Sequence, residues 1–238
     1  METGLTKTRC TLEKYITACD NSDDNVVLMS SGDMWQGASE SNLTHGRIMT
    51  DWMNSLSFTS MTLGNHEFDW GEEYIESNLK LADFPFLAIN IYDRATNERV
   101  DYCEPSVTVS FGEATIGIIG AIGDCYSSIS GDKVENIYFK TGEELNSLIR
   151  AESERLRSEG ADFIVLSLHD SGADVTLSRD HVDLVFEGHT HQRYVLKDEY
   201  GVYHLQNGGE NKGISHVEIR LNIANEKSSI NTAEFIAS

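Results

Sequence analysis

Four short apolar segments of this chain each lead directly into side chains that can bind a metal ion. Such runs are typical of strands buried inside a sheet. The four junctions are residues 26–29 before Asp33, 60–63 before Asn65 and His66, 163–168 before His169, and 182–186 before His189 and His191. Loops at the carboxyl ends of strands carry the chemistry in many α/β folds. The pattern therefore predicts that these side chains gather in loops at the ends of the strands.

Helix-like and strand-like patterns alternate early in the chain, and strand-like patterns dominate late. Apolar residues at helical spacing predict helices from Gly4 to the polar residues 21–25, and over roughly 42–54, 72–81 and 142–157. Further strands are predicted at 86–91, in a hairpin over 106–111 and 114–119, and repeatedly after Tyr194. This order favours an α/β fold with mixed sheets in a single domain over residues 1–238.

The charge of the chain restricts its partners. Lys and Arg number 18 against 39 Asp and Glu, which gives a formal net charge of −21. Such a surface repels nucleic-acid backbones and anionic membranes, so we expect no polymeric nucleic-acid partner. An anionic substrate would approach only where bound cations reverse the local potential, as two divalent metals in one site would do.

Cysteine spacing and hydropathy add further expectations. Cys10 and Cys19 are expected on one helix, too far apart to bridge, and all four cysteines are read as buried free thiols. No apolar run is long enough to cross a bilayer, and residues 1–20 have neither the basic start nor the apolar middle of a signal peptide. We therefore expect no membrane span, and the oligomeric state stays open.

Each candidate ligand taken alone has a simpler explanation. The candidates are Asp33, Asn65, His66, His169, His189 and His191. The first three fit turns or helix caps, and His169 fits a hydrogen-bonded residue at a strand end. The last two histidines could face opposite sides of an extended segment. Four strand ends that all deliver oxygen or imidazole donors nevertheless favour a metal site, and this donor set suits Zn, Mn, Fe or Co ions.

The motifs in combination resemble a known superfamily. They are Gly32-Asp33 with Gln36-Gly37, Gly64-Asn65-His66-Glu67-Phe68-Asp69, His169, and Gly188-His189-Thr190-His191. This set looks like the calcineurin-like metallophosphoesterases. The segments Ala88-Ile89-Asn90-Ile91 and Gln206-Asn207-Gly208 narrow the resemblance to the 5'-nucleotidase and UDP-sugar hydrolase family. The resemblance extends from about Gly4 to the C-terminal strands and implies a four-layer α/β/β/α sandwich.

The resemblance also implies a role for individual residues. Asp33 would bridge two divalent metal ions, with Asn65, His169 and His189 completing the second site and His191 belonging to the first. His66 would be the catalytic histidine over the substrate phosphate, oriented by Asp69, and Asn90 is a candidate substrate-binding residue. Asp69 could equally be an acid favoured by the dipole of the following helix. The implied reaction is attack by a metal-activated hydroxide on the phosphorus of a small phosphoester.

One part of the family pattern is missing from this sequence. Family members begin with a strand that ends in Asp-x-His, and no such motif is present here. Truncation at the N-terminus is favoured over genuine loss, because the missing strand would be central and its absence would leave a sheet edge unpaired. We expect the N-terminal type of 5'-nucleotidase domain without the C-terminal nucleotide-binding domain. We also expect at most one tightly bound metal and slow hydrolysis.

Several functions remain in competition at this stage. The first is hydrolysis of nucleotides or related organic phosphates, and its close rivals are a 2',3'-cyclic phosphodiesterase and a nucleotide-sugar pyrophosphatase. A metal-binding or interaction domain without catalysis is the alternative from another class. The aromatic residues beside the motifs, Trp35, Phe68 and Trp70, are expected to pack in the core rather than line a pocket. The resemblance suggests an extracellular or cell-surface location and leaves the cytoplasm open.

Overall fold

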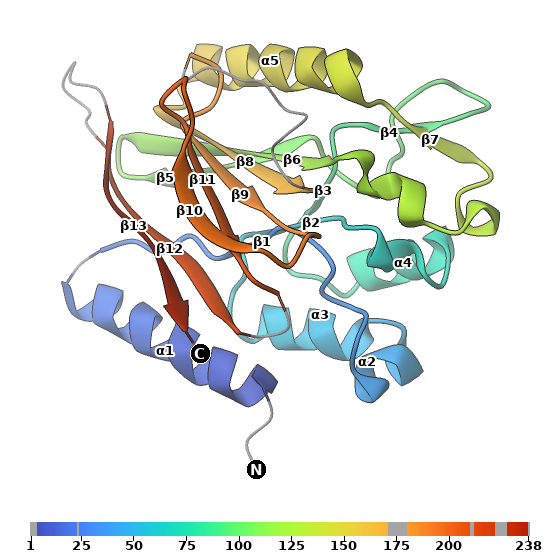
Figure 1. The fold of residues 1–238 in the computed structure, drawn as a ribbon, viewed down its shortest axis with the longest axis horizontal. Helices are drawn as coiled ribbons and strands as arrows, with labels where there is room; N and C mark the ends of the chain where they lie inside the picture. The colour runs from blue at the N-terminus through green and yellow to red at the C-terminus, as the bar shows by residue number, and fades with distance from the viewer. Residues whose placement is uncertain (1–3, 23, 171–179, 210–211, 222–227, 238) are drawn as a thin grey trace.

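Two stacked sheets with helices on their outer sides form the molecule (Figure 1). The computed structural model describes residues 4–22, 24–170, 180–209, 212–221 and 228–237. Helix α5 (Gly142–Ser158) covers the larger sheet, while α2 (Ser39–Thr44), α3 (Arg47–Asn54) and α4 (Glu72–Leu79) lie beyond the smaller sheet. The predicted α/β/β/α sandwich with mixed sheets is confirmed.

The two main sheets differ in the direction of their strands. The smaller sheet is parallel, in the order β1 (Met29–Ser30), β2 (Ser60–Thr62) and β3 (Phe86–Leu87). The larger sheet has the order β10-β11-β9-β8-β6-β5, with bounds β5 (Ser106–Phe111), β6 (Ala114–Ile122), β8 (Phe163–His169), β9 (Leu184–Glu187), β10 (Arg193–Lys197) and β11 (Tyr203–Asn207). Its four inner strands are parallel and its two edge strands are antiparallel to their neighbours.

Smaller elements complete the fold. The strand pairs are β4 (Ile91–Asp93) with β7 (Ile137–Phe139), and β12 (Gly213–Arg220) with β13 (Ser229–Ala237). Short 3₁₀ helices are η1 (His66–Phe68), η2 (Asp124–Ser128) and η3 (Gly131–Lys133). Helix α1 (Gly4–Ser22) lies beside β12 and β13, where the Tyr15 ring is 5.0 Å from that of His216. The late strands without helices were predicted, whereas β7 was not.

The core lies in layers that follow the sheets. Between the sheets, one cluster joins Leu87 of β3 to Ile118, Val165, Leu184 and Leu205 of the larger sheet. Fully burying an aliphatic side chain of this size contributes about 1.5–3 kcal/mol. A hydroxyl bond of 2.7 Å from Thr62 to Ser167 crosses the same interface. The two sheets are therefore held face to face, which fixes the relative positions of their strand ends.

The outer face of the larger sheet is covered by α5. Leu145, Ile149 and Leu156 form one apolar stripe of this helix and pack against Ile119 and Leu166 of the sheet. The predicted helix over 142–157 is confirmed. Cys10 and Cys19 lie on α1 as expected, and all four cysteines are free. Cys10 is exposed and Cys19 is only partly buried, however, so the prediction of buried thiols was wrong for these two, because α1 lies at the surface.

The predicted continuous helix over 42–54 was wrong, because the chain breaks it into α2 and α3. His45 and Gly46 both have left-handed backbones, with φ of 48° and 83°. A Cβ on Gly46 would lie 2.5 Å from Cγ of the buried Trp35. The indole therefore leaves room only for a glycine there, and the tertiary contact overrides the helical pattern of the sequence.

The predicted strand over 86–91 is also interrupted. Strand β3 pairs with β2, whereas β4 leaves that sheet and pairs with β7. Between them the Asn90 amide donates to the carbonyls of Ile122 and Lys140 at 2.7 and 2.9 Å, and accepts from the Ile122 N–H at 3.1 Å. This side chain replaces strand pairing and redirects the chain.

Across the described ranges, none of the helices has the length and apolar character that a membrane crossing requires.

Candidate metal centre

The ends of four strands from both sheets meet at one place. Asp33 follows β1, Asn65 follows β2, His169 is the last residue of β8, and His189 follows β9. The parallel strands in each sheet point the same way, so their carboxyl ends share one edge. The face-to-face packing of the sheets brings the two edges together. The convergence expected from the sequence is thus present in the fold.

Each of these four side chains has a donor atom within hydrogen-bonding distance of a donor atom of its neighbour in the centre. His169 Nε2 is 3.1 Å from Asp33 Oδ2 and 3.1 Å from Asn65 Oδ1. His189 Nδ1 is 2.9 Å from the same amide oxygen. One carboxylate, one amide oxygen and two imidazole nitrogens are therefore linked by a chain of short contacts, from Asp33 through His169 and Asn65 to His189. This donor set fits a borderline divalent cation, which prefers nitrogen and oxygen ligands.

Glycines pack closely around the His169 ring. A Cβ on Gly64 would lie 2.8 Å from His169 Cε1, and one on Gly188 would lie 2.9 Å from Nδ1. His169 Nδ1 faces the Ser31 carbonyl at 2.5 Å. That contact requires a proton on Nδ1, so in the neutral ring Nε2 carries the lone pair that a cation could bind. The shape of the loops thus orients this imidazole for a cation.

Asp33 joins two parts of the centre. Its backbone is left-handed, with φ of 58°, and its Oδ1 accepts the backbone N–H of His66 at 2.9 Å. The simple interpretation of Asp33 as a turn residue is therefore partly right, although Oδ2 also faces His169. Asn65, at the start of η1, makes no capping bond with its side chain and uses its amide for the two histidines.

Glu67 is the residue of this region whose role the sequence did not reveal. It is fully buried and accepts four backbone N–H groups, from Gly64 at 2.6 Å, Met34 at 2.8 Å, Asp33 at 2.9 Å and Trp35 at 3.3 Å. Burial and the nearby Asp33 charge raise the pKa of its carboxyl. Glu67 ties the loop after β1 to the loop after β2. The only sequence signal was its place in the Gly64–Glu67 motif.

His66 and Asp69 form a pair at the surface of the centre. His66 Nδ1 is 2.9 Å from Asp69 Oδ2, and their side chains are 41% and 34% exposed. Helix α4 begins at Glu72, so Asp69 lies outside its first turn and the helix-dipole explanation does not apply. The backbone bond to Asp33 holds His66 beside the four donors while its ring reaches solvent.

The loop that carries His189 and His191 is compact rather than extended. Both residues have left-handed backbones, with φ of 64° and 53°. Gln206 Oε1 accepts from Thr190 Oγ1 at 2.9 Å and from the Gln192 N–H at 2.7 Å. His189 points to Asn65, whereas His191 is exposed and lies against Gly209. The structure thus brings His189, but not His191, onto the Asn65 amide.

The ionisable side chains of the centre shift one another's pKa values. Burial alone would lower the pKa of the His169 ring, but its hydrogen bond to Asp33 and the charge of that carboxylate raise it overall. Burial alone would raise the pKa of Asp33, but the hydrogen bond and the charge of His169 lower it overall. The pKa of His189 is lowered by burial and by His169. His189 is thereby favoured in the neutral form that can bind a cation.

Asn90, the candidate substrate-binding residue, is buried, and its described contacts are the backbone bonds to Ile122 and Lys140. Cys125, by contrast, lies at the centre although the sequence did not single it out. A ring nitrogen of His169, one of His189 and the Cys125 Sγ lie within 4.8 Å of one another. Burial raises the pKa of this thiol, with Asp170 and Asp33 adding to the effect.

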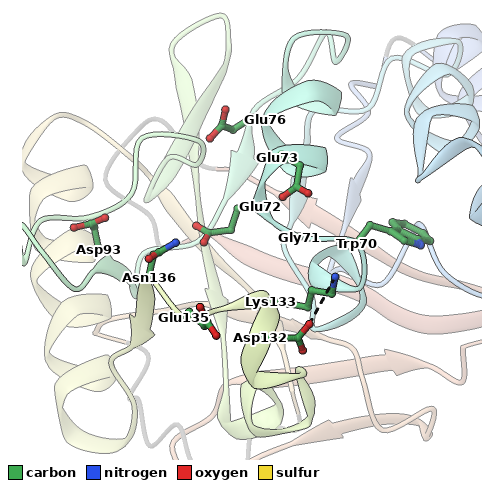
Figure 2. A pocket seen from close by; sticks show the side chains of 10 residues that line it. All are labelled: Trp70, Gly71, Glu72, Glu73, Glu76, Asp93, Asp132, Lys133, Glu135 and Asn136. Carbon is green, nitrogen blue, oxygen red and sulfur yellow. Dashed lines mark ion pairs between the residues drawn. The ribbon is translucent and has the colours of Figure 1, made fainter.

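A separate cavity of about 460 Å³ lies beside α4 (Figure 2). Its lining residues are Trp70, Gly71, Glu72, Glu73, Glu76, Asp93, Asp132, Lys133, Glu135 and Asn136. Six carboxylates against one lysine make it unsuited to a phosphate group. The pKa of Glu72 is raised by burial and by repulsion from Glu76 and Asp93. The hydrogen bond from Tyr102 acts in the opposite direction but does not outweigh them.

Trp35 and Phe68 are fully buried, as predicted for core residues. Trp70 is partly buried: it packs against the core cluster and also lines the acidic cavity, so the expectation of core packing is only partly right for this residue.

Comparison with known proteins decides the family. The sequence matches the calcineurin-like phosphoesterase family over residues 8–193, which include every residue of the centre. The chain belongs to this family of calcineurin-like phosphoesterases. The family comprises metal-dependent phosphoesterases, so membership implies divalent cations without identifying them.

Relatives with names of their own are similar to part of the chain. A probable 5'-nucleotidase of Treponema pallidum is 29% identical over 180 residues, which are 74% of this chain and 29% of that protein. A snake venom 5'-nucleotidase of Crotalus adamanteus is 31% identical over 174 residues, which are 70% of this chain and 29% of that protein. The match thus spans less than a third of the length of these relatives.

A solved structure agrees in fold. The 5'-nucleotidase precursor of Thermus thermophilus superimposes with a TM-score of 0.78 at 22% identity, covering 93% of this chain and 47% of that one. At this identity the likeness establishes the calcineurin-like phosphoesterase fold and nothing finer.

Proposed function

We propose that this chain is the catalytic domain of a phosphoester hydrolase that acts on nucleotides or related organic phosphates. The observation that carries the proposal is the convergence of Asp33, Asn65, His169 and His189, whose neighbouring donor atoms lie 2.9–3.1 Å apart. Membership of the phosphoesterase family supports the reaction class. The names of the 5'-nucleotidase relatives support nucleotides as substrates.

These four residues would hold one divalent cation of the Zn, Mn, Fe or Co class. A bound cation would supply Lewis acidity, polarising a phosphoryl oxygen and lowering the pKa of water. His191 would contribute to a further metal site. The chain's own residues must therefore orient the phosphoester and handle its protons.

His66 is suited to the proton transfer. Asp69 holds Nδ1 of the ring, which leaves Nε2 pointing away from that bond and available to a phosphoryl or leaving-group oxygen. A carboxylate in this position fixes the orientation of the ring. His66 would donate its Nε2 proton to the leaving oxygen, and Asp33 would keep the His66 backbone in place.

The test compares His66→Asn with His216→Asn, a histidine on β12 that pairs with Glu234. Release of phosphate from a nucleoside monophosphate should fall by about 10²–10⁴-fold in His66→Asn, while the metal content of this variant stays unchanged. The His216→Asn variant should release phosphate at the wild-type rate. Full activity in His66→Asn would contradict the role of this residue. Metal binding without turnover in the wild-type protein would instead favour a non-catalytic metal-binding domain.

A substrate panel separates the remaining enzymatic alternatives. We propose that nucleoside monophosphates are hydrolysed faster than a 2',3'-cyclic nucleotide or a nucleotide sugar. The reverse order would assign the chain to one of those rivals.

Two further proposals concern the domain type and the location of the protein. We propose that residues 1–238 belong to an N-terminal-type 5'-nucleotidase domain. We also propose an extracellular location, which the name of the snake venom relative supports.

A further inference from the structure

Cys125 brings a sulfur donor to the same centre. Its Sγ, one ring nitrogen of His169 and one of His189 all lie within 4.8 Å of one another. The residue is 5% exposed, so its thiol is shielded from bulk solvent. Three side chains of types that bind metals therefore face a common volume, two of them shared with the proposed cation site.

The fold fixes this cysteine against the end of β8. Ile122 of β6 is in register with His169, and Gly123 donates its backbone N–H to the His169 carbonyl at 3.1 Å. The Cys125 N–H is held by Asp170 Oδ2 at 2.8 Å, and its thiol donates to the same His169 carbonyl at 2.8 Å. The sulfur thus lies beside the backbone of His169 because two parallel strands end together.

The proposed donor set carries a single negative charge, against two positive charges on a divalent cation. Asp33 is the one carboxylate among its four residues, and the Asn65 amide and both imidazoles are neutral when they bind a cation. A thiolate from Cys125 would bring the total ligand charge to −2, which balances the charge of a divalent cation. The thiol proton would leave to solvent as the cation binds, and the sulfur would exchange its hydrogen bond with His169 for the cation.

We propose that Cys125 is a thiolate ligand of the cation held by His169 and His189. This inference rests on the cation site of the proposed function and specifies its chemistry. Thiolate ligands favour zinc-like ions over Mn²⁺ or Mg²⁺, which prefer oxygen. The site is therefore a mixed sulfur, nitrogen and oxygen centre selective for Zn²⁺ and Co²⁺.

Cys103 provides the matched control. It is also buried, at 3% exposure, and its thiol donates to a backbone carbonyl, that of Ala88, at 3.4 Å. It shares burial, a carbonyl partner and the same apolar core cluster with Cys125. Among the described residues, however, only Cys125 is grouped with His169 and His189. If Cys125 were only a core thiol, replacing either cysteine by serine would have the same effect on metal binding.

Cobalt spectroscopy tests the sulfur ligand directly. Less than one equivalent of Co²⁺ is added to the metal-free protein in a background of Cys10→Ser and Cys19→Ser, which removes the thiols of α1. We expect a thiolate-to-cobalt charge-transfer band in the near ultraviolet. It should persist in Cys103→Ser and vanish in both Cys125→Ser and Cys125→Ala. Zn²⁺ affinity should fall about tenfold or more in the Cys125 variants, with Mn²⁺ affinity little changed.

A band that persists in the Cys125 variants, or Co²⁺ bound to the background protein without any such band, would overturn the inference. If a Cys125 variant fails to fold, the inference can still be overturned with the background protein, because Co²⁺ bound there without a thiolate band excludes a sulfur ligand. Metal-dependent phosphoester hydrolysis without the thiolate band would leave the proposed function standing while removing the inference. The band without any hydrolysis would support the sulfur ligand and contradict the proposed function.

Discussion

At the residue scale, Glu67 makes the arrangement of the candidate ligands possible. Its buried carboxylate accepts backbone N–H groups from the loops after β1 and β2. Hydrogen bonds to a charged acceptor are stronger than neutral ones, and a buried N–H left without a partner costs about 1–3 kcal/mol. The position of Asp33 relative to Asn65 therefore depends on a side chain that is not itself a candidate ligand.

We predict that Glu67→Ala destabilises the protein by about 3 kcal/mol or more, because several buried N–H groups lose their acceptor at once. Glu154→Ala, which removes an exposed carboxylate on α5, should change the unfolding free energy by less than about 0.5 kcal/mol. Urea denaturation measures both. Equal effects of the two substitutions would show that Glu67 does not hold the loops together.

The sequence predicts the candidate ligands better than the residues that position them. Asp33, Asn65, His169 and His189 stand out because each follows an apolar strand, and the fold brings all four together. Glu67 and Cys125 reach the centre only through the packing of one loop or sheet on another. No spacing rule within a single strand or helix could have revealed those contacts.

At the scale of single elements, the loop after β9 holds two histidines in unfavourable backbone conformations. A left-handed backbone at a residue other than glycine costs about 1–2 kcal/mol, and His189 and His191 both adopt it. Gln206 of β11 opposes that strain with two bonds to the loop. The conformation of this loop therefore depends on a neighbouring strand of the sheet.

We predict that Gln206→Leu weakens binding of Zn²⁺ by about 10–100-fold, because the loop that orients His189 loses its two anchoring bonds. The control is Gln192→Leu, since Gln192 contributes its backbone N–H rather than its side chain to the Gln206 contact. Isothermal titration calorimetry gives both affinities. Unchanged Zn²⁺ affinity in Gln206→Leu would mean that the loop holds its conformation without this side chain.

A second prediction concerns the break between α2 and α3. Gly46→Ala should destabilise the protein by about 1–3 kcal/mol more than Gly142→Ala, because both glycines have positive φ but only Gly46 would push a Cβ into Trp35. Thermal and urea unfolding of the two variants measure the difference. Equal destabilisation would show that backbone strain alone accounts for the glycine.

The elements that sequence patterns missed share a physical cause. The helical pattern of 42–54 fails where an indole packs on Gly46, and the strand 86–91 fails where the Asn90 amide replaces strand pairing. Long amphipathic segments such as α5 were predicted because their own pattern determines the buried face. Short segments next to a buried polar or aromatic group were determined by that group instead.

At the scale of the whole molecule, the strong negative charge makes stability depend on where protons and cations bind. His204 shows this for protons, since its Nδ1 is 2.7 Å from Glu187 and its Nε2 is 3.3 Å from Asp198. Burial alone would lower the pKa of this ring, but the two carboxylates raise it overall above 6.5. The contribution of the ion pairs is then present below 6.5 and lost as the pH rises through the folded pKa.

We therefore predict that His204→Gln costs about 1–2 kcal/mol of unfolding free energy below the ordinary histidine pKa, and progressively less at higher pH. His216→Gln, which removes a partly exposed histidine paired with Glu234, controls for general effects of pH. Denaturation across a pH series gives the two differences. A cost that grows with rising pH would contradict the assigned direction.

The measurement that tests the central claim most directly is the metal content of the purified wild-type chain and of Asn65→Leu. Both are saturated with Zn²⁺, dialysed and subjected to elemental analysis. Asn65 Oδ1 is 2.9 Å from His189 and 3.1 Å from His169, so its loss should open the centre. We predict about one tightly bound equivalent in the wild type and a large loss in the variant. No bound metal in the wild type, or the same content in Asn65→Leu, would contradict the candidate metal centre.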